Sequence, residues 1–234
     1  MSVGYDIFAI GYACVDYVTI MPYLPKLDEK ILVDNLLVQG GGVAATAMVA
    51  ASRLGAKTAL MTMLSDDSIG HEIAAELERA GVDMSVTPLR DKGSSAFSFC
   101  MIDSKTGLRT IVSMPPTGKR LSRLEVPLGV VRRSQVLFID GHTIQAQLAA
   151  AKAARRAGVR VIFDAGNEKK GMVDLIPHTD VLIASHGFGR DVGGSCDPAA
   201  GARALFRMGK LEVAAVTAGK EGSYFCTAEG EFHQ

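Results

Sequence analysis

The second half of the chain alternates short apolar runs with amphipathic segments. Apolar runs of four or five residues predict strands over 136–140, 159–163, 181–184 and 213–217. Between them the pattern predicts a helix over 143–157, closed by Gly158, and another from Asp197-Pro198 to Met208. Strands that are apolar almost throughout and separated by helices are typical of a parallel sheet covered on both faces.

The first half mixes this pattern with β segments that do not fit it. Strands are predicted over 7–10 and 57–64, and helices over 43–54 and 69–80. Three further β segments, 31–38, 95–102 and 109–114, lie outside the alternation, and the last two read as a hairpin. We therefore predict one α/β domain over 1–234. It has a mostly parallel sheet, helices on both faces and a small β lid from about 12–38 and 95–114.

Three glycines separate the predicted strand 31–38 from the small-residue helix 43–54. Gly40, Gly41 and Gly42 allow positive φ and close approach of another group, and the helix that follows offers free backbone N–H groups. The stretch is consistent with a polar ligand held by backbone amides. It is equally consistent with a tight turn before a well-packed helix, because a glycine-rich turn alone is a weak motif.

Composition narrows the class of protein. The chain has 234 residues, 48% apolar and 21% charged, with a formal net charge of zero, as expected for an ordinary globular protein. Nothing in the charge indicates nucleic acid, no stretch is long and apolar enough for a membrane span, and the N-terminus does not read as a signal peptide. Four scattered cysteines predict neither a zinc site nor disulfides and favour a reducing cytoplasm.

Several polar residues follow predicted strands, where open α/β sheets bind ligands. Asp16 lies shortly after the strand 7–10, His142 follows 136–140, and Asp164 follows 159–163. Arg109 lies on the predicted lid, where it could meet an anionic group on a ligand. A surface aspartate, a loop histidine and a solvated edge arginine remain the alternatives. His186 has no partner in the sequence that would indicate metal binding.

Taken together, motifs spread along the chain resemble the PfkB family of ribokinase-like carbohydrate kinases. They are Gly41-Gly42, Arg53-Leu-Gly-Ala56, Ser65-Asp-Asp-Ser-Ile-Gly70, Glu78-Arg-Ala-Gly-Val-Asp83, Phe163-Asp164 and Val216-Thr-Ala-Gly-Lys-Glu-Gly222. The run Gly40–Ala47 and the ending Glu229–Gln234 are most similar to the branch of sulfofructose kinases and ketohexokinases.

The resemblance implies transfer of the γ-phosphoryl group of ATP, with Mg²⁺, to a hydroxyl of a small sugar, either a ketose or a sugar derivative. The substrate-binding residues it implies, together with those expected from position, are Asp16, Gly41, Gly42, Thr46, Arg109 and His142. The nucleotide-binding residues are Asp164, Ser185, Thr217, Gly219 and Gly222. The lid is expected to close over the sugar and to pair two chains into a homodimer.

Three departures from the family pattern matter. Thr46 stands where the family usually has asparagine, and Ser185-His-Gly-Phe188 stands where it has Asn-x-x-Glu, so the metal ligands stay undefined. The Gly-Ala-Gly-Asp segment with the catalytic aspartate is absent, so catalytic residues are expected beyond Gln234 and this chain alone is expected to be inactive. A sugar-binding protein that has lost catalysis is therefore the alternative. A nicotinamide oxidoreductase is disfavoured, because no Gly-x-Gly-x-x-Gly follows the first strand.

Overall fold

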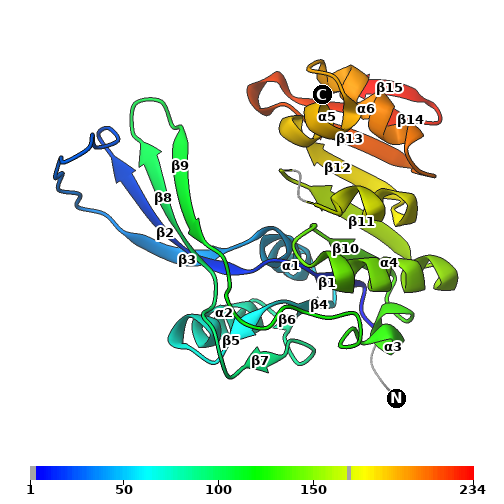
Figure 1. Ribbon diagram of the computed structural model, residues 1–234, viewed down its shortest axis with the longest axis horizontal. Coiled ribbons are helices and arrows are strands. Elements are labelled where there is room, and N and C mark those ends of the chain that lie inside the picture. The colour runs from blue at the N-terminus through cyan, green and yellow to red at the C-terminus, as the bar shows by residue number, and fades with distance from the viewer. Residues whose placement is uncertain (1–3, 168–169) are drawn as a thin grey trace.

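The main body of the protein is a twisted, largely parallel sheet. The computed structural model describes residues 4–167 and 170–234, and within them nine strands follow the order β15-β14-β13-β12-β11-β10-β1-β4-β6 (Figure 1). The strands are β1 (Ile7–Ile10), β4 (Thr58–Met61), β6 (Val82–Asp83), β10 (Val136–Ile139), β11 (Arg160–Ala165), β12 (Val181–Ser185), β13 (Val213–Thr217), β14 (Ser223–Thr227) and β15 (Gly230–His233). Neighbouring pairs from β6 to β13 are parallel, and β14 and β15 add two antiparallel strands at one edge.

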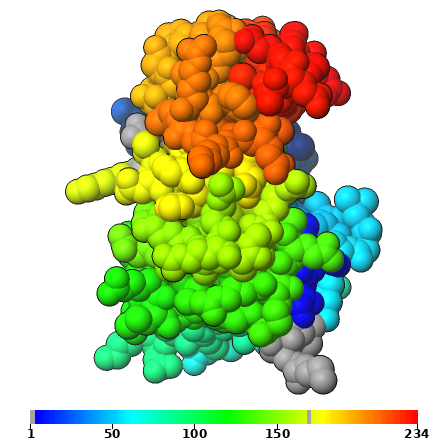
Figure 2. All heavy atoms as spheres, turned by 90° about the vertical axis from the view of Figure 1, so that its right-hand side faces the viewer, coloured from blue at the N-terminus to red at the C-terminus, as the bar shows by residue number. Residues whose placement is uncertain are grey.

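Helices connect the strands and cover the sheet. They are α1 (Val43–Arg53), α2 (Ser68–Arg79), α3 (Leu128–Val131), α4 (Ile144–Ala157), α5 (His186–Gly193) and α6 (Pro198–Arg207), with 3₁₀ turns η1 (Met172–His178) and η2 (Gly219–Glu221). On the face turned away from the lid, green segments in the lower half are followed upward by yellow and orange segments and by β15 in red at the top (Figure 2). The predicted α/β fold is confirmed. Helix α5 was not predicted, because its His-Gly-Phe-Gly start gives little helical signal.

Two apolar clusters occupy the opposite faces of the sheet. Phe8 and Ile10 belong to the larger cluster with α4, α5 and α6, whereas Ala9 between them belongs to the cluster under α1 and α2. This division follows from the period-2 alternation of side chains along a strand. It explains why central strands are apolar at every position and could be recognised from sequence alone.

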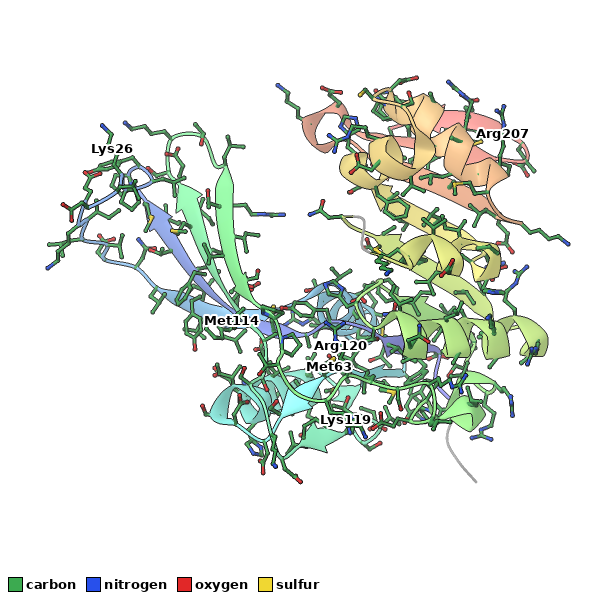
Figure 3. All side chains as sticks on the ribbon, viewed as in Figure 1. Lys26, Met63, Met114, Lys119, Arg120 and Arg207 are labelled. Atoms are coloured by element: carbon green, nitrogen blue, oxygen red, sulfur yellow. The ribbon has the colours of Figure 1, made fainter. Side chains whose placement is uncertain are left out.

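The lid is a separate four-stranded sheet in the order β3-β2-β8-β9. Its strands are β2 (Cys14–Met21), β3 (Leu37–Gly41), β8 (Phe97–Asp103) and β9 (Arg109–Met114). The predicted hairpin forms β8 and β9, whereas β2 was not predicted as a strand. β2 and β8 pair in parallel although they lie far apart in the sequence, and the sheet rises from the body as one arm of an open V (Figure 1). Lys26 lies at its far tip (Figure 3).

The strand predicted over 31–38 is wrong in position. The structure places β3 at Leu37–Gly41, so two of the three glycines belong to the lid strand and not to a turn. Asn35 explains where the ladder stops. Its side chain accepts a hydrogen bond from Ile20 N at 2.7 Å and donates to Ile20 O at 3.0 Å, which replaces the backbone pairing of a further strand residue.

The base of the lid is fixed to α2 and to the small parallel pair β5 (Leu64–Ser65) and β7 (Leu89–Arg90). Asp67 caps α2 by accepting from Gly70 N at 2.7 Å, and its other oxygen accepts from Ser95 N at 2.8 Å, just before β8. On the other side of the lid, the Glu76 carboxylate accepts from Gly40 N at 3.0 Å. These hydrogen bonds attach the base of the lid to α2 and so fix the orientation of the lid relative to the body.

Candidate functional site

Gly42 is the point at which the lid meets the first helix. It has φ of 97° and ψ of 141° and precedes α1, which has no side-chain cap. A Cβ at this position would lie 2.5 Å from Tyr12 O and 2.7 Å from Ala13 Cα, both backbone atoms. The residue must therefore be glycine, both for its backbone angle and for the close approach of the chain after β1. Ala45 N, in the first turn of α1, donates to Tyr12 O at 3.2 Å, so the start of the helix lies against the chain just before β2.

Asp16 extends from β2 against the adjacent glycine strand. The carboxylate occupies the space that a side chain at Gly41 would fill, and its Oδ1 accepts a hydrogen bond from Cys14 Sγ at 3.4 Å. Asp16 is half-buried, so its oxygens keep a face open to the cleft. The aspartate and the two glycines that the sequence indicated are brought together here.

The two faces of the lid have different chemistry. Alternation along β8 places Ser98 and Cys100 on the side of Asp16, and Phe97 and Phe99 on the opposite side. Burial and the charge of Asp16 raise the pKa of the Cys100 thiol, and the charge of Arg109 acts in the opposite direction. Asp16 and the guanidinium of Arg109 therefore lie on the same, inner face of the lid, one on either side of Cys100.

A cleft of about 940 Å³ lies between this inner face and the body. Its walls include six of the eleven residues expected to bind sugar or nucleotide, namely Asp16, Gly42, Thr46, Arg109, His142 and Asp164. Gly41 lines an adjoining pocket of about 350 Å³ that shares Asp16 and Thr46 with the cleft. The volume is ample for a monosaccharide, and the donors and acceptors on the walls suit a polyhydroxy ligand.

The body side of the cleft is formed by the carboxyl ends of adjacent parallel strands. Asp140 and His142 follow β10, and Asp164 lies near the end of β11. The His142 ring stacks on Tyr12, with centroids 4.5 Å apart and planes at 17°. Burial raises the pKa of Asp164, the charge of Asp140 raises it further, and His142 opposes both. A carboxyl group held above its usual pKa in a cleft is typical of a functional site.

We expect Asp164→Asn to stabilise the protein at neutral pH. The folded pKa lies above the unfolded value of about 3.9, so the folded state binds more protons than the unfolded state between the two pKa values, and stability falls as pH rises through that window. Asparagine removes this penalty. Melting temperatures at pH 7 and at pH 3.5 test the expectation. The gain should be present at pH 7 and largely absent at pH 3.5, whereas Asp91→Asn on an exposed loop should give none at either pH.

The remaining nucleotide candidates continue along the same edge of the sheet. Ser185 ends β12, where it accepts from Phe188 N at 3.1 Å as the N-cap of α5 and donates to Gly166 O at 3.0 Å. Thr217 ends β13 beside it in register. Gly219 and Gly222, with φ of 59° and 87°, form the turn of η2 that follows. These four residues follow Asp164 in the strand order β11-β12-β13, and none of them lines the cleft.

The residues present only partly fit a divalent cation. Among residues 4–167 and 170–234, no three His, Cys, Asp or Glu side chains are grouped so that they could hold a metal ion. Mg²⁺ is commonly held by one or two carboxylates together with phosphate oxygens and water. Asp164 fits one such ligand, and Asn167 on the same wall offers an amide oxygen. The side chains alone do not define a metal site, and the Mg²⁺ requirement remains a prediction.

Sequence reasoning missed three residues of the site. The Tyr12 ring stacks on the His142 ring, and the Asp140 carboxylate lies beside Nδ1 of His142. Ser113 on β9 lines the cleft. The position of Asp140 directly after a buried strand was a usable signal, of the same kind that identified Asp164. Tyr12 and Ser113 carried no signal, because their roles depend on which distant segment they face.

The fold and this site define a class of protein: an α/β body of the ribokinase-like fold whose strand ends face a β lid across a polar cleft. Residues 6–234 match the model of the pfkB family carbohydrate kinases, and the chain belongs to that family. In the described residues, no helix is both long and apolar enough to cross a membrane.

Individual relatives are distant. The chain is 27% identical to mouse ribokinase over 173 residues, which cover 73% of this chain and 53% of that protein. It is 23% identical to mouse ketohexokinase over 196 residues, covering 80% and 66% respectively. The structure of Arabidopsis thaliana ribokinase complexed with ribose and ATP superposes with a TM-score of 0.78 at 19% identity, over 99% of this chain and 78% of that one. The chain thus spans about half to two thirds of these two mouse relatives.

Proposed function

We propose that this protein is an ATP-dependent sugar kinase that transfers the γ-phosphoryl group to a hydroxyl of a small sugar. The observation that carries the proposal is the single cleft in which the lid carboxylate Asp16, the start of α1 at Gly42, and the strand-end residues His142 and Asp164 face one another. Membership of the pfkB family supports this reading of the cleft. The scattered cysteines favour a cytoplasmic location.

In this proposal the sugar lies between the lid and α1. Asp16 accepts hydrogen bonds from two hydroxyls, and the amides beside Gly41 and Gly42 donate to sugar oxygens. Thr46 and His142 contact further hydroxyls, and Arg109 approaches from the lid. An anionic substituent on the sugar would be attracted by Arg109, which agrees with the resemblance to the sulfofructose kinase branch. A ketose or a sugar derivative is therefore the proposed acceptor.

The triphosphate would approach from the other end of the cleft. Asp164 stands at the junction, and Ser185, Thr217, Gly219 and Gly222 continue along the strand ends toward the β14 edge. Phosphoryl transfer depends mainly on positioning and on neutralising charge, and Mg²⁺ supplies charge neutralisation when it is bound with the nucleotide. The residues of this chain position the acceptor and exclude water around it.

The experiment combines binding with turnover. Titration calorimetry of the chain with ribose, fructose and sulfofructose, each with and without ATP and Mg²⁺, measures which ligands occupy the cleft. A coupled assay of ADP release, carried out with the complete gene product, measures turnover with the same panel. Sugar-dependent ADP release supports the kinase. No binding of any sugar and no binding of ATP would refute the proposal.

A sugar-binding protein without catalysis is the second candidate, and one observation favours it. Ser185-His-Gly-Phe188 stands where the family pattern has Asn-x-x-Glu, and in the structure Ser185 is engaged as a helix cap. The same calorimetric experiment separates the two functions. A sugar that binds with an affinity unaffected by ATP, together with an absence of ADP release when the complete gene product is supplied with Mg²⁺, would favour this second function.

We also propose that the lid pairs two chains into a homodimer. The outer face of the lid carries a cluster in which Tyr17, Phe97 and Phe99 contact one another at centroid distances of 5.6 to 6.2 Å. Phe99, Val112 and Met114 are 50%, 55% and 47% exposed on it. Contiguous exposed apolar surface of this kind marks an interaction site, and a thin sheet needs one face covered.

Phe99→Asp should convert the dimer into a monomer. A buried, unpaired carboxylate at an apolar interface costs several kcal/mol of binding free energy, and a dimer held by a small interface does not form after such a loss. Sedimentation velocity at micromolar concentration measures the change. Leu54→Asp is the matched control, because Leu54 is 88% exposed after α1 and away from the lid. A wild-type monomer, or a dimer that tolerates Phe99→Asp as well as Leu54→Asp, would contradict this interface.

A further inference from the structure

Beneath the cleft floor lies a carboxylate that no part of the proposed reaction uses. The Asp140 side chain is completely buried at the end of β10. Its Oδ2 accepts from Tyr12 N at 2.6 Å, and its Oδ1 accepts from Gln147 Nε2 at 2.9 Å and from His142 N at 3.1 Å. Burial opposes ionisation, but these donors and the adjacent His142 outweigh it, so the pKa of Asp140 lies below its ordinary value.

His142 stands between this carboxylate and the cleft. Its Nδ1 lies 3.3 Å from Asp140 Oδ1, close enough for an ion pair although the ring is not aligned for a straight hydrogen bond. The ring is held flat against Tyr12, and its side chain is 27% exposed. Because the Nδ1 edge faces Asp140 and the stacked face is covered by Tyr12, the accessible edge of the ring is the one that carries Nε2.

The charged groups around His142 come from several elements. Asp140 lies below it on β10, and Asp164 influences it from β11. On its other side is a smaller pocket of about 330 Å³, which Tyr12 and His142 share with Arg120 from the segment after β9. Arg120 and Met63 lie at the junction of lid and body (Figure 3). Among the described residues, Asp140 is the only acidic residue within ion-pair distance of a ring nitrogen of His142.

We propose that Asp140 is a positioning residue that keeps a proton on Nδ1 of His142. The unprotonated Nε2 then faces the cleft and accepts a hydrogen bond from a hydroxyl of the bound acceptor. Asp140 cannot reach an acceptor itself, because its side chain has no exposed surface. This inference rests on the proposed function only for the identity of the ligand. The arrangement of Asp140, His142 and Tyr12 is independent of it.

The chemistry follows from the donor and acceptor inventory. An ionised carboxylate only accepts hydrogen bonds, so the ring nitrogen that faces it must be the N–H. In the neutral ring Nε2 then has a lone pair that accepts from a sugar hydroxyl. For metal-binding histidines, losing a partner that fixes the tautomer and orientation of the ring costs about 10- to 100-fold in affinity or activity, and we expect a loss at the lower end of this range here. His142 would thus select acceptors with a hydroxyl at this point of the cleft.

The tautomer can be measured without any ligand. Long-range ¹H–¹⁵N correlation spectra of ¹⁵N-histidine-labelled protein distinguish Nδ1–H from Nε2–H rings above the pKa of the imidazole. The chain has five histidines, and His142→Gln identifies the signals of His142 by their loss. We expect His142 to be the Nδ1–H tautomer and Asp140→Asn to shift it toward Nε2–H. An Nε2–H ring in the wild-type protein would overturn the proposal, whether or not Asp140→Asn folds.

A second measurement links the tautomer to binding. The fructose dissociation constant should rise about tenfold in both Asp140→Asn and His142→Gln, and no further in the double variant, because Asp140 acts through His142. Additive losses in the double variant would contradict a positioning role. If fructose does not bind the wild-type protein, fructose is excluded as the acceptor, while the spectra still test the tautomer. Gln135→Ala, directly before β10 and so at the opposite end of this strand from Asp140, is the control for local packing changes.

Discussion

Gly42→Ala should reduce the free energy of unfolding by about 3 kcal/mol or more, one of the largest losses available to a single methyl group in this chain. The residue has φ of 97°, a conformation that costs a non-glycine residue about 1–3 kcal/mol. The added Cβ would also meet Tyr12 O and Ala13 Cα at 2.5 and 2.7 Å. Both are backbone atoms just before β2, so relief requires that the lid strand move away from α1.

The matched control for this substitution is Gly55→Ala. Gly55 has almost the same φ, 96°, but a Cβ there meets nothing within 4 Å. It should therefore lose only the conformational part, about 1–3 kcal/mol, and less than Gly42→Ala loses. Urea titrations followed by circular dichroism give both values. Equal losses at the two positions would show that the contact between Gly42 and the Tyr12–Ala13 backbone does not constrain the fold.

Asp16→Asn should weaken sugar binding by about 1.5–3 kcal/mol, or roughly 10- to 150-fold in the dissociation constant. Asparagine keeps the size of the side chain but replaces one acceptor oxygen with a donor and removes the charge. The side chain can then no longer accept hydrogen bonds from two sugar hydroxyls at once, and the hydrogen bond that remains is no longer strengthened by a negative charge. Calorimetry with the sugar that binds the wild-type protein measures the effect directly, and kcat/KM follows it wherever turnover is observed.

The control for Asp16→Asn is Asp28→Asn at the lid tip. Asp28 is exposed and has φ of 62°, which asparagine also tolerates. Asp28→Asn therefore removes one negative charge from the lid, as Asp16→Asn does, but at a position outside the cleft. We expect no change in sugar affinity there, and a similar melting temperature for both variants. Sugar affinity that is unaffected by Asp16→Asn would remove Asp16 from the site and leave the glycine amides as the lid's contribution.

The body could be predicted from sequence because each of its central strands is buried on both faces. Phe8 and Ile10 pack on one side and Ala9 on the other, so the run is apolar without interruption. The lid strand β2 was missed for the opposite reason. Asp16 interrupts an otherwise β-like segment because its side chain faces the cleft and not an apolar core, so the alternating pattern is broken there.

The site was predictable to the extent that its residues follow strands. Asp164 and His142 could be expected to lie together at the cleft because the carboxyl ends of parallel strands share one edge. The pairing of Tyr12 N with the Asp140 carboxylate joins residues 128 apart in the sequence. No local pattern reports such a contact. The order of the strands, which places β1 beside β10, had to be known first.

The parallel pairing of β2 with β8 has a consequence for the order of folding. Val15 lies opposite Phe97, 82 positions later in the sequence, so the first register pair closes a long loop that contains α1, α2 and β4. Closing so long a loop costs entropy before any lid contact forms, and this cost falls once the intervening segment is compact. The lid should therefore assemble after the α1–α2 half of the body. In pulse-labelling hydrogen exchange during refolding, amides of β2 and β8 should become protected later than those of β1 and β4.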